Sequence, residues 1–511
     1  MIFLRILLSF TFPLIYCTNS YEQELKQVLD SYMWKDPNCT FNHFEINSIT
    51  INSFPQCSNV YGILVINENT DLNLGQLPNR FKNLRKLYGG IIIENTNWTS
   101  VSIFPSNSYI NLYCENYVFH IRNNSKLTDG QLLWDLDWIP NENREDCDFR
   151  VENNPQLDME YYCESENLEK LLKIRTSGNL KDCGCQGDQI TSENLPSYSK
   201  CTKLFNGLKL SNITDLSSLS ALSNIQEIRG DINIQNTSIQ NLTFLENMLR
   251  WKVRSSEKLI LNLKNNLNMT RLPLEFFGAF QNFLSGTIIA NLENLHPEFC
   301  VTIEEILKIF ELQLSFVNFH GKVCDETGDI GDLILCRFES MDDLPNNCQI
   351  ILGDFIIEKG DEDHFTKLPD LTLIIGKVII RYTELENFLD FGYDLRIFHI
   401  ADSDPVFQII GNKKLKNPTI ETILSIITRD EKREAVFQDN RPDIFPSRVC
   451  KLVTEFYGIV PADRKYRTRL NYIGGDCGEY VQVKSSEDRK IWSLLMSILA
   501  AQLLVYGKPN R

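Results

Sequence analysis

The chain has 511 residues, of which 43% are hydrophobic, and its 67 acidic and 51 basic residues give a formal net charge of −16. The acidic excess is spread along the sequence without a basic stripe. This distribution argues against a nucleic-acid partner, because phosphate binding requires clustered Lys and Arg.

Residues 1–20 have the layout of a secretory signal peptide. Arg5 precedes an apolar run from Ile6 to Ile15, and small residues follow it. The alternative is an N-terminal membrane anchor, but the run is too short to cross a bilayer. We therefore expect residues 1–20 to be removed and the remaining chain to fold in an oxidising, extracellular compartment.

Cysteines and glycosylation sequons agree with this location. Fourteen cysteines remain once Cys17 is removed with the signal peptide, which allows seven disulfides. Metal binding by Cys183 and Cys185 is the weaker interpretation, since no His lies nearby. The sequons that predict a glycoprotein are at Asn38, Asn97, Asn123, Asn212, Asn236, Asn241 and Asn268. For Asn123 and Asn236, a buried, hydrogen-bonded side chain is the alternative.

One spacing pattern of apolar residues and glycine occurs three times in the chain. Apolar residues at steps of three lead to a glycine, and alternating apolar residues follow it. The three glycines are Gly89, Gly230 and Gly376. The strands then end at Asn95-Thr96, Asn236-Thr237 and Tyr382-Thr383. Self-similarity at long range marks a repeat architecture, so we expect three copies of one module in tandem.

Each copy is expected to contain short strands stacked as the turns of a coil. Spacing of two, as in Leu64/Ile66 and again in Ile91/Ile93, places one side of successive strands in a core. The glycine suits the tight bend before the second strand, because a positive φ costs it little. Helical spacing near the end of each copy predicts capping helices over 168–172, 301–310 and 419–427.

Cysteine positions repeat with the copies and predict the disulfides. Symmetry between the copies gives the pairs Cys39–Cys57, Cys163–Cys183, Cys185–Cys201, Cys300–Cys324 and Cys336–Cys348. Elimination then leaves Cys114–Cys147 and Cys450–Cys477.

The C-terminal region contains an apolar run over residues 491–507, followed by a short basic tail. Its length is at the lower edge of what spans a bilayer. Three interpretations remain open: a spanning helix, a GPI-attachment signal, or a buried terminal helix of a soluble protein. The first two predict a protein tethered to the cell surface, and the third predicts a secreted one.

The sequence contains no catalytic constellation. Its six histidines are scattered, and none lies in a metal-binding or nucleophile motif. We therefore expect no enzymatic activity, no metal and no cofactor. Function is therefore expected to depend on surface contacts, and the outward residues of the central strands are the candidate ligand contacts. They are Ile92 and Glu94 in the first copy, Asn233 and Gln235 in the second, and Ile379 and Arg381 in the third.

The order of these features resembles the receptor L domain, the ligand-binding module of the insulin and epidermal growth factor receptor ectodomains. The phrases that carry the resemblance are Gly89–Trp98, Gly230–Ile239 and Val151–Leu157. The chain is similar to nematode proteins made mainly of such domains, although it has neither a cysteine-rich module between the first two copies nor kinase motifs.

The resemblance implies three L domains, each a right-handed parallel β-helix, leucine-rich-repeat-like, with short capping helices. Their expected ranges are 39–183, 185–324 and 336–450, followed by a juxtamembrane segment at 451–490. The implied function is extracellular capture of a peptide ligand, insulin-like or EGF-like, or of another L-domain protein, as a decoy, co-receptor or sensory accessory. A structural or adhesive surface glycoprotein is the alternative.

Overall fold

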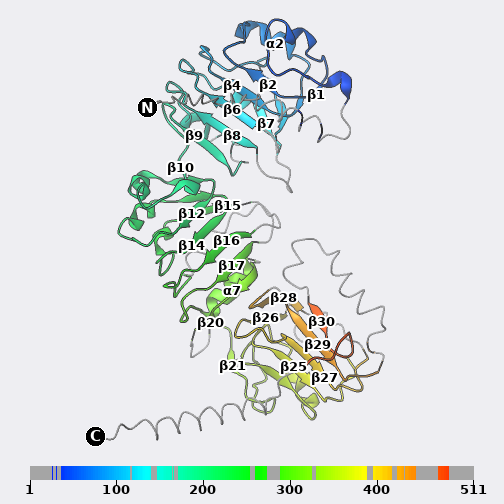
Figure 1. The fold of residues 1–511 in the computed structure, drawn as a ribbon. Coiled ribbons are helices and arrows are strands. Elements are labelled where there is room, and N and C mark those ends of the chain that lie inside the picture. Colours follow the sequence, from blue (N-terminus) through cyan, green and yellow to red (C-terminus); the bar gives the residue numbers. More distant parts are fainter. Residues whose placement is uncertain are drawn as a thin grey trace, which may run out of the picture. The chain divides into compact units, whose positions relative to one another are not determined.

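The computed structural model describes residues 26, 30 and 36–482, apart from gaps at 107, 115–117, 140–146, 164, 166–167, 169–170, 254–258, 273–287, 313, 325–329, 388–394, 417–422, 431, 443 and 445–469. The chain divides into two compact units, residues 1–288 and 289–511. The strands are short and pair in parallel within each unit (Figure 1).

The first repeat contains two parallel sheets in the first unit. One sheet consists of β1 (Asn59–Tyr61), β3 (Lys86–Tyr88), β5 (Ile110–Tyr113) and β7 (Leu136–Trp138). The other consists of β2 (Leu64–Ile66), β4 (Ile91–Glu94), β6 (Val118–Arg122), β8 (Asp148–Glu152) and β9 (Ile174–Ser177). From β1 to β8 successive strands alternate between the two sheets, so each turn of chain adds one strand to each sheet, and β9 then pairs with β8 in the second sheet.

The register places equivalent residues of the pattern side by side. Leu64 pairs with Ile91 and Ile66 with Ile93, and all four side chains are buried. Gly89 has φ +154°, and a Cβ there would lie 1.9 Å from the carbonyl oxygen of Gly62. The positive φ agrees with the predicted bend, and the close approach of consecutive turns is a second reason for glycine here.

The second repeat begins in the first unit with the same arrangement. One sheet consists of β10 (Cys185–Gln186), β11 (Lys203–Phe205), β13 (Glu227–Arg229) and β15 (Arg250–Lys252). The other sheet includes β12 (Leu208–Ser211), β14 (Ile232–Gln235) and β16 (Leu259–Lys264).

The second unit begins with the end of the second repeat. Its parallel pairs are β17 (Ile289–Glu293) with β19 (Ser315–Phe319) and β18 (Cys300–Val301) with β20 (Lys322–Val323). In the chain, helix α7 (Ile303–Glu311) lies between β18 and β19, close to the predicted range 301–310. Thr302 and Glu305 form a capping box at its start, so both side chains satisfy backbone N–H groups that the helix leaves open.

Two five-stranded sheets make up the third repeat. One consists of β21 (Leu335–Arg337), β22 (Ile350–Leu352), β24 (Leu373–Ile375), β26 (Leu395–His399) and β28 (Ile423–Thr428). The other consists of β23 (Phe355–Ile357), β25 (Val378–Arg381), β27 (Phe407–Ile410), β29 (Glu434–Gln438) and β30 (Asn471–Ile473). Strand β30 lies within the predicted juxtamembrane segment, so the sheet of this repeat continues past residue 450.

The helix predicted over 419–427 is wrong. Residues Ile423–Thr428 form β28, which pairs with β26. Three isoleucines in this segment favour a strand because their β-branched side chains fit the pleated surface, and the apolar steps of three and four were misleading. The helix predicted over 168–172 lies partly outside the described residues.

The other helices whose bounds lie within the described residues span only three to six residues each. The α-helical ones are α2 (Leu77–Arg80), α3 (Leu132–Asp135) and α4 (Glu160–Cys163). The 3₁₀ turns are η1 (Pro37–Cys39), η2 (Thr50–Ser53), η3 (Leu74–Gln76), η4 (Gly187–Gln189), η5 (Leu195–Lys200), η6 (Leu219–Leu222), η7 (Thr243–Leu245) and η9 (Glu362–Lys367).

Six disulfides join described cysteines, and each is a predicted pair. They are Cys39–Cys57, Cys114–Cys147, Cys163–Cys183, Cys185–Cys201, Cys300–Cys324 and Cys336–Cys348. Cys477 is also disulfide-bonded, while its predicted partner Cys450 lies outside the described residues. These bonds exclude the alternative that Cys183 and Cys185 bind a metal as free thiolates.

Among the described residues, no helix has the length and apolar character needed to cross a membrane. The predicted signal peptide at 1–20 and the apolar run at 491–507 both lie outside the described residues.

Candidate functional site

The second repeat carries an accessible polar row on the outer face of its central strand. Asn233 and Gln235 are half-buried, whereas the alternate residues Ile232 and Ile234 are buried in the core. The Gln235 side-chain amide donates to Asn233 Oδ1 at 2.6 Å, and the Asn262 amide donates to the same oxygen at 3.3 Å. The structure therefore places both predicted residues in one hydrogen-bonded group.

Neighbouring strands extend this group into a polar surface. In the register of β12, β14 and β16, Lys209 lies beside Asn233 and Asn233 beside Asn262. A second row places Ser211, Gln235 and Lys264 side by side. We call these six residues, Lys209, Ser211, Asn233, Gln235, Asn262 and Lys264, the polar face.

Sequence reasoning missed four members of the polar face. These four residues alternate with buried leucines along their strands: they are Lys209, Ser211, Asn262 and Lys264. Their period-two spacing was a signal in the sequence that their side chains face outward. The repeat could also have predicted that these residues lie close together, because equivalent positions of successive turns lie side by side.

In the first repeat, the prediction that Ile92 is exposed is wrong. Ile92 has 0% exposure and belongs to the hydrophobic core cluster together with its register partner Val65. The run Ile91-Ile92-Ile93 is continuous rather than alternating, which is typical of strands covered on both faces. Glu94 is half-buried, and its carboxylate accepts from the Arg122 guanidinium at 2.8 Å.

The corresponding prediction for the third repeat is also wrong. Ile379 is only 5% exposed, within the continuous run Val378-Ile379-Ile380. Arg381 is half-buried and forms an ion pair with Glu358 of the preceding turn. Lys377, just before this strand, is 1% exposed, and its ammonium lies 3.2 Å from both Asp402 and Asp404.

Paired asparagines after the strands form ladders that are structural rather than ligand-binding. Asn124 Oδ1 accepts from the backbone N–H and hydroxyl of Thr96, while its amide donates to the carbonyl of Ile93 at 3.0 Å. Asn266 makes the same contacts in the second repeat and Asn412 in the third. These buried side chains satisfy backbone groups at the corners.

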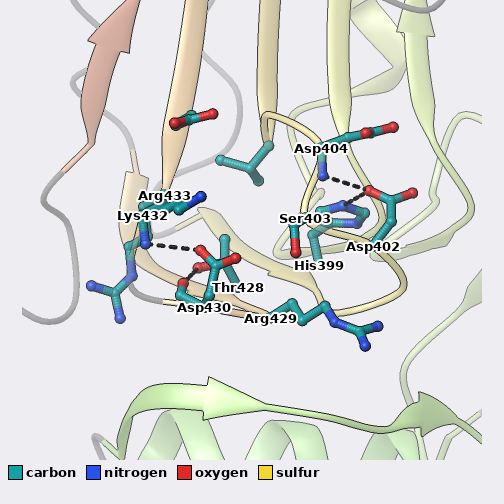
Figure 2. A pocket seen from close by; sticks show the side chains of 11 residues that line it. His399, Asp402, Ser403, Asp404, Thr428, Arg429, Asp430, Lys432 and Arg433 are labelled. Carbon is teal, nitrogen blue, oxygen red and sulfur yellow. Dashed lines mark hydrogen bonds and ion pairs between the residues drawn. The ribbon is translucent and has the colours of Figure 1, made fainter.

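A small pocket lies in the third repeat, at the ends of β26 and β28 (Figure 2). Its cavity volume is about 10 Å³, which is room for about one water molecule. Asp430 caps its own turn, because its carboxylate accepts from the backbone N–H of Lys432 at 2.9 Å. With a volume of about 10 Å³, the pocket is too small for an organic ligand.

The charges of this pocket are set by His399 and Asp402. His399 is 3% exposed, and burial lowers its pKa despite the opposing effect of Asp402, whose carboxylate lies 2.9 Å from Nε2. Burial would raise the pKa of Asp402, but the backbone N–H of Asp404, with His399 and Lys377, lowers it to about 2. At neutral pH the imidazole is therefore neutral and the carboxylate ionised.

Nothing in the described part of the chain groups three or more His, Cys, Asp or Glu side chains so that they could hold a metal ion. The predicted sequons are accessible there. Asn38, Asn97, Asn123, Asn212, Asn236 and Asn268 are exposed, and Asn241 is half-buried. The alternative that Asn123 and Asn236 are buried is thus wrong, since the buried ladder positions are the neighbouring Asn124 and the later Asn266.

Parallel sheets in repeated copies, with disulfides joining described cysteines in each copy, define a disulfide-bonded repeat protein. The Receptor L domain family matches the chain three times, over residues 56–169, 200–311 and 347–456, together more than half of its length. The chain therefore belongs to the Receptor L domain family. No curated protein and no solved structure matches it.

Proposed function

We propose that this protein captures an extracellular polypeptide through its L domains and acts as a decoy, co-receptor or sensory accessory. The ligand is an insulin-like or EGF-like peptide or another L-domain protein. Membership of the Receptor L domain family carries this proposal, and the disulfides support it because they persist in oxidising compartments.

We infer that each repeat is a right-handed parallel β-helix within the ranges 39–183, 185–324 and 336–450. Alternation of strands between two sheets in each repeat supports this geometry. A coil of this kind presents broad outer faces, and repeat proteins commonly bind partners on such faces.

Of the three central strands, the one in the second repeat offers the best contact surface for the ligand. Its amides are half-buried and hold one another in place, so binding would order few additional side chains. The equivalent positions of the other repeats are Ile92 and Ile379, which are buried and unavailable to a ligand. Lys209 and Lys264 add positive charge beside the amides.

The test is binding of the purified protein to a panel of insulin-like and EGF-like peptides from the same organism. We expect at least one peptide to bind, and the variant Gln235→Arg to weaken that binding at least about tenfold by introducing a long charged side chain into the polar face. Gln226→Arg is the matched control, since Gln226 is an exposed glutamine of the same repeat beside the other sheet.

Absence of binding across the whole panel, with self-association or matrix binding instead, would contradict ligand capture and favour the structural or adhesive alternative. Equal loss of binding in both variants would contradict the assignment of the polar face.

We also propose that the segment at 491–507 tethers the protein to the cell surface, after removal of residues 1–20 and with glycans on the exposed sequons. Treatment of intact cells with a phosphatidylinositol-specific phospholipase distinguishes the anchors. Release into the medium indicates a GPI anchor, retention indicates a spanning helix, and protein found in the medium without treatment contradicts tethering.

A further inference from the structure

The residue after the central strand has the same backbone conformation in all three repeats but a different side chain in the third. Asn95, Asn236 and Tyr382 occupy equivalent positions with φ of +55°, +53° and +58°. This left-handed conformation is accessible to Asn at low cost, whereas a bulky aromatic residue is strained there. Strain of this kind is a reason to examine the side chain for a function.

Tyr382 is 61% exposed, and its ring lies against the next turn of the coil. A Cβ atom on Gly411 would lie 2.5 Å from Tyr382 Cδ1, so only glycine leaves room for the ring. In the first two repeats the residues of this next turn are Asn123 and Asn265. The third repeat has therefore replaced two asparagines by a matched tyrosine and glycine.

A second exposed tyrosine and a carboxylate complete this corner. Tyr480 is 68% exposed, and its hydroxyl donates to Asp439 Oδ2 at 3.2 Å. Asp439, with φ +55°, occupies the turn after Gly411. The charge of Asp439 raises the pKa of Tyr480, which reports a negative potential at the phenol. Lys413 lies nearby, but its ammonium is bound to the backbone carbonyl of Asp439.

N-glycans would cover the equivalent corners of the other repeats but not this one. In the first two repeats this row of left-handed residues includes the exposed sequon residues Asn123, Asn212 and Asn236. The sequence has no sequon after Asn268. The aromatic corner therefore stays accessible in the glycosylated protein.

We propose that Tyr382, Gly411, Asp439 and Tyr480 form a contact surface for a basic segment of an extracellular polypeptide, with an arginine stacking on a tyrosine ring and pairing with Asp439. A planar guanidinium suits both partners, because it stacks on aromatic rings and donates to carboxylates. The net charge of −16 also favours a basic ligand. This inference rests on the proposed ligand capture and names the chemistry of a second surface.

Selection from a library of random twelve-residue peptides displayed on phage tests the proposal, with the purified wild-type protein as target and peptides that bind Tyr382→Asn removed. Tyr382→Asn restores the residue found in the other repeats at a position whose backbone suits it, so the fold is retained. We expect the recovered peptides to be enriched in arginine.

Individual synthetic peptides from this selection are then measured by titration. We expect Tyr382→Asn and Asp439→Asn each to weaken binding by about tenfold, the magnitude of one stacking or ion-pair contact. Tyr109→Asn is the matched control, because Tyr109 is 72% exposed in the first repeat, and it should bind like the wild type. Circular dichroism of each variant verifies the fold.

Recovery of peptides without arginine enrichment, or equal binding by wild type and Tyr382→Asn, would overturn the proposal. These results would leave the peptide panel and the Gln235→Arg comparison untouched, so failure of this contact surface is distinguishable from failure of ligand capture itself. Peptides enriched in acidic residues would also contradict it.

Discussion

Strands β4 and β14 follow the same sequence phrase, yet their outer faces differ completely. Both strands follow the glycine of the repeated pattern, Gly89 or Gly230, and both bury their alternate isoleucines. The residue between those isoleucines is Ile92 in β4, with 0% exposure, and half-buried Asn233 in β14. The intervening residue therefore reports whether a strand is covered on one face or on both.

The third repeat shows what covers an outer face. The outward row of β24, β26 and β28 includes Ile375, Phe398 and Ile427, all buried. Phe319 of β19 contacts Phe398 with ring centroids 5.4 Å apart, and Phe310 of α7 lies 6.4 Å away. Within the second unit, the end of the second repeat thus packs on the third.

Exchange of the two intervening residues tests this comparison, and Ile92→Asn should have the largest effect. The substitution removes a fully buried apolar side chain and buries an amide without a matched partner, so we expect a loss of about 3–5 kcal/mol in the free energy of unfolding. Urea denaturation measures it, with Ile92→Val as a control that should lose only about 0.5–1.5 kcal/mol. A loss as small for Asn as for Val would show that the outer face of β4 is open.

The asparagine ladder is shared by the first two repeats, and its removal should cost somewhat more in the first, where the Asn124 side-chain amide also donates to Asn154 Oδ1. Asn124→Ala and Asn266→Ala each leave a buried threonine N–H and a strand carbonyl without their bonds, so we expect losses of about 2–4 kcal/mol. Asn265→Gly is the neighbouring control, since its φ of +57° suits glycine. Strongly unequal losses would show that the two repeats do not share one inner architecture.

The third repeat should lose stability in mild acid through His399. Burial lowers the pKa of His399 in the folded state, so below the ordinary value of 6.5 the unfolded chain binds more protons and stability falls. Between pH 7.5 and 5.5 the loss is at most about 1.4 kcal/mol.

Thermal unfolding of the wild type and His399→Gln at both pH values measures this contribution. His320, whose pKa burial also lowers, is present in both proteins, so the difference between them isolates His399. An identical pH response of the two proteins would contradict the assignment.

The reverse exchange, Asn233→Ile, should have the smallest effect on stability. It removes the hydrogen bonds to Gln235 and Asn262 from an accessible surface, so the free energy of unfolding should change by less than about 1 kcal/mol. Urea denaturation beside Ile92→Asn gives the comparison directly. A loss as large as that of Ile92→Asn would mean that the polar face is packed against other parts of the protein.

The repeats, the strands around Leu64 and Ile91 and five of the disulfides were predictable, because each follows from local spacing that recurs between copies, whereas Cys114–Cys147 followed only by elimination. The outer faces were only partly predictable. Alternation predicted that Asn233 and Gln235 face outward, and both are half-buried there, but Ile92 and Ile379 were assigned outward without regard to the continuous isoleucine runs around them. Ile92 belongs to the hydrophobic core cluster of the first repeat, which alternation within a single strand does not reveal.

Hydrogen–deuterium exchange on the complex with a peptide from the insulin-like and EGF-like panel tests the central claim most directly. The account predicts slower exchange on ligand binding in Leu208–Ser211, Ile232–Gln235 and Leu259–Lys264, with no change in Ile91–Glu94. Unchanged exchange in all three strands of the polar face, or protection confined to Ile91–Glu94, would contradict it.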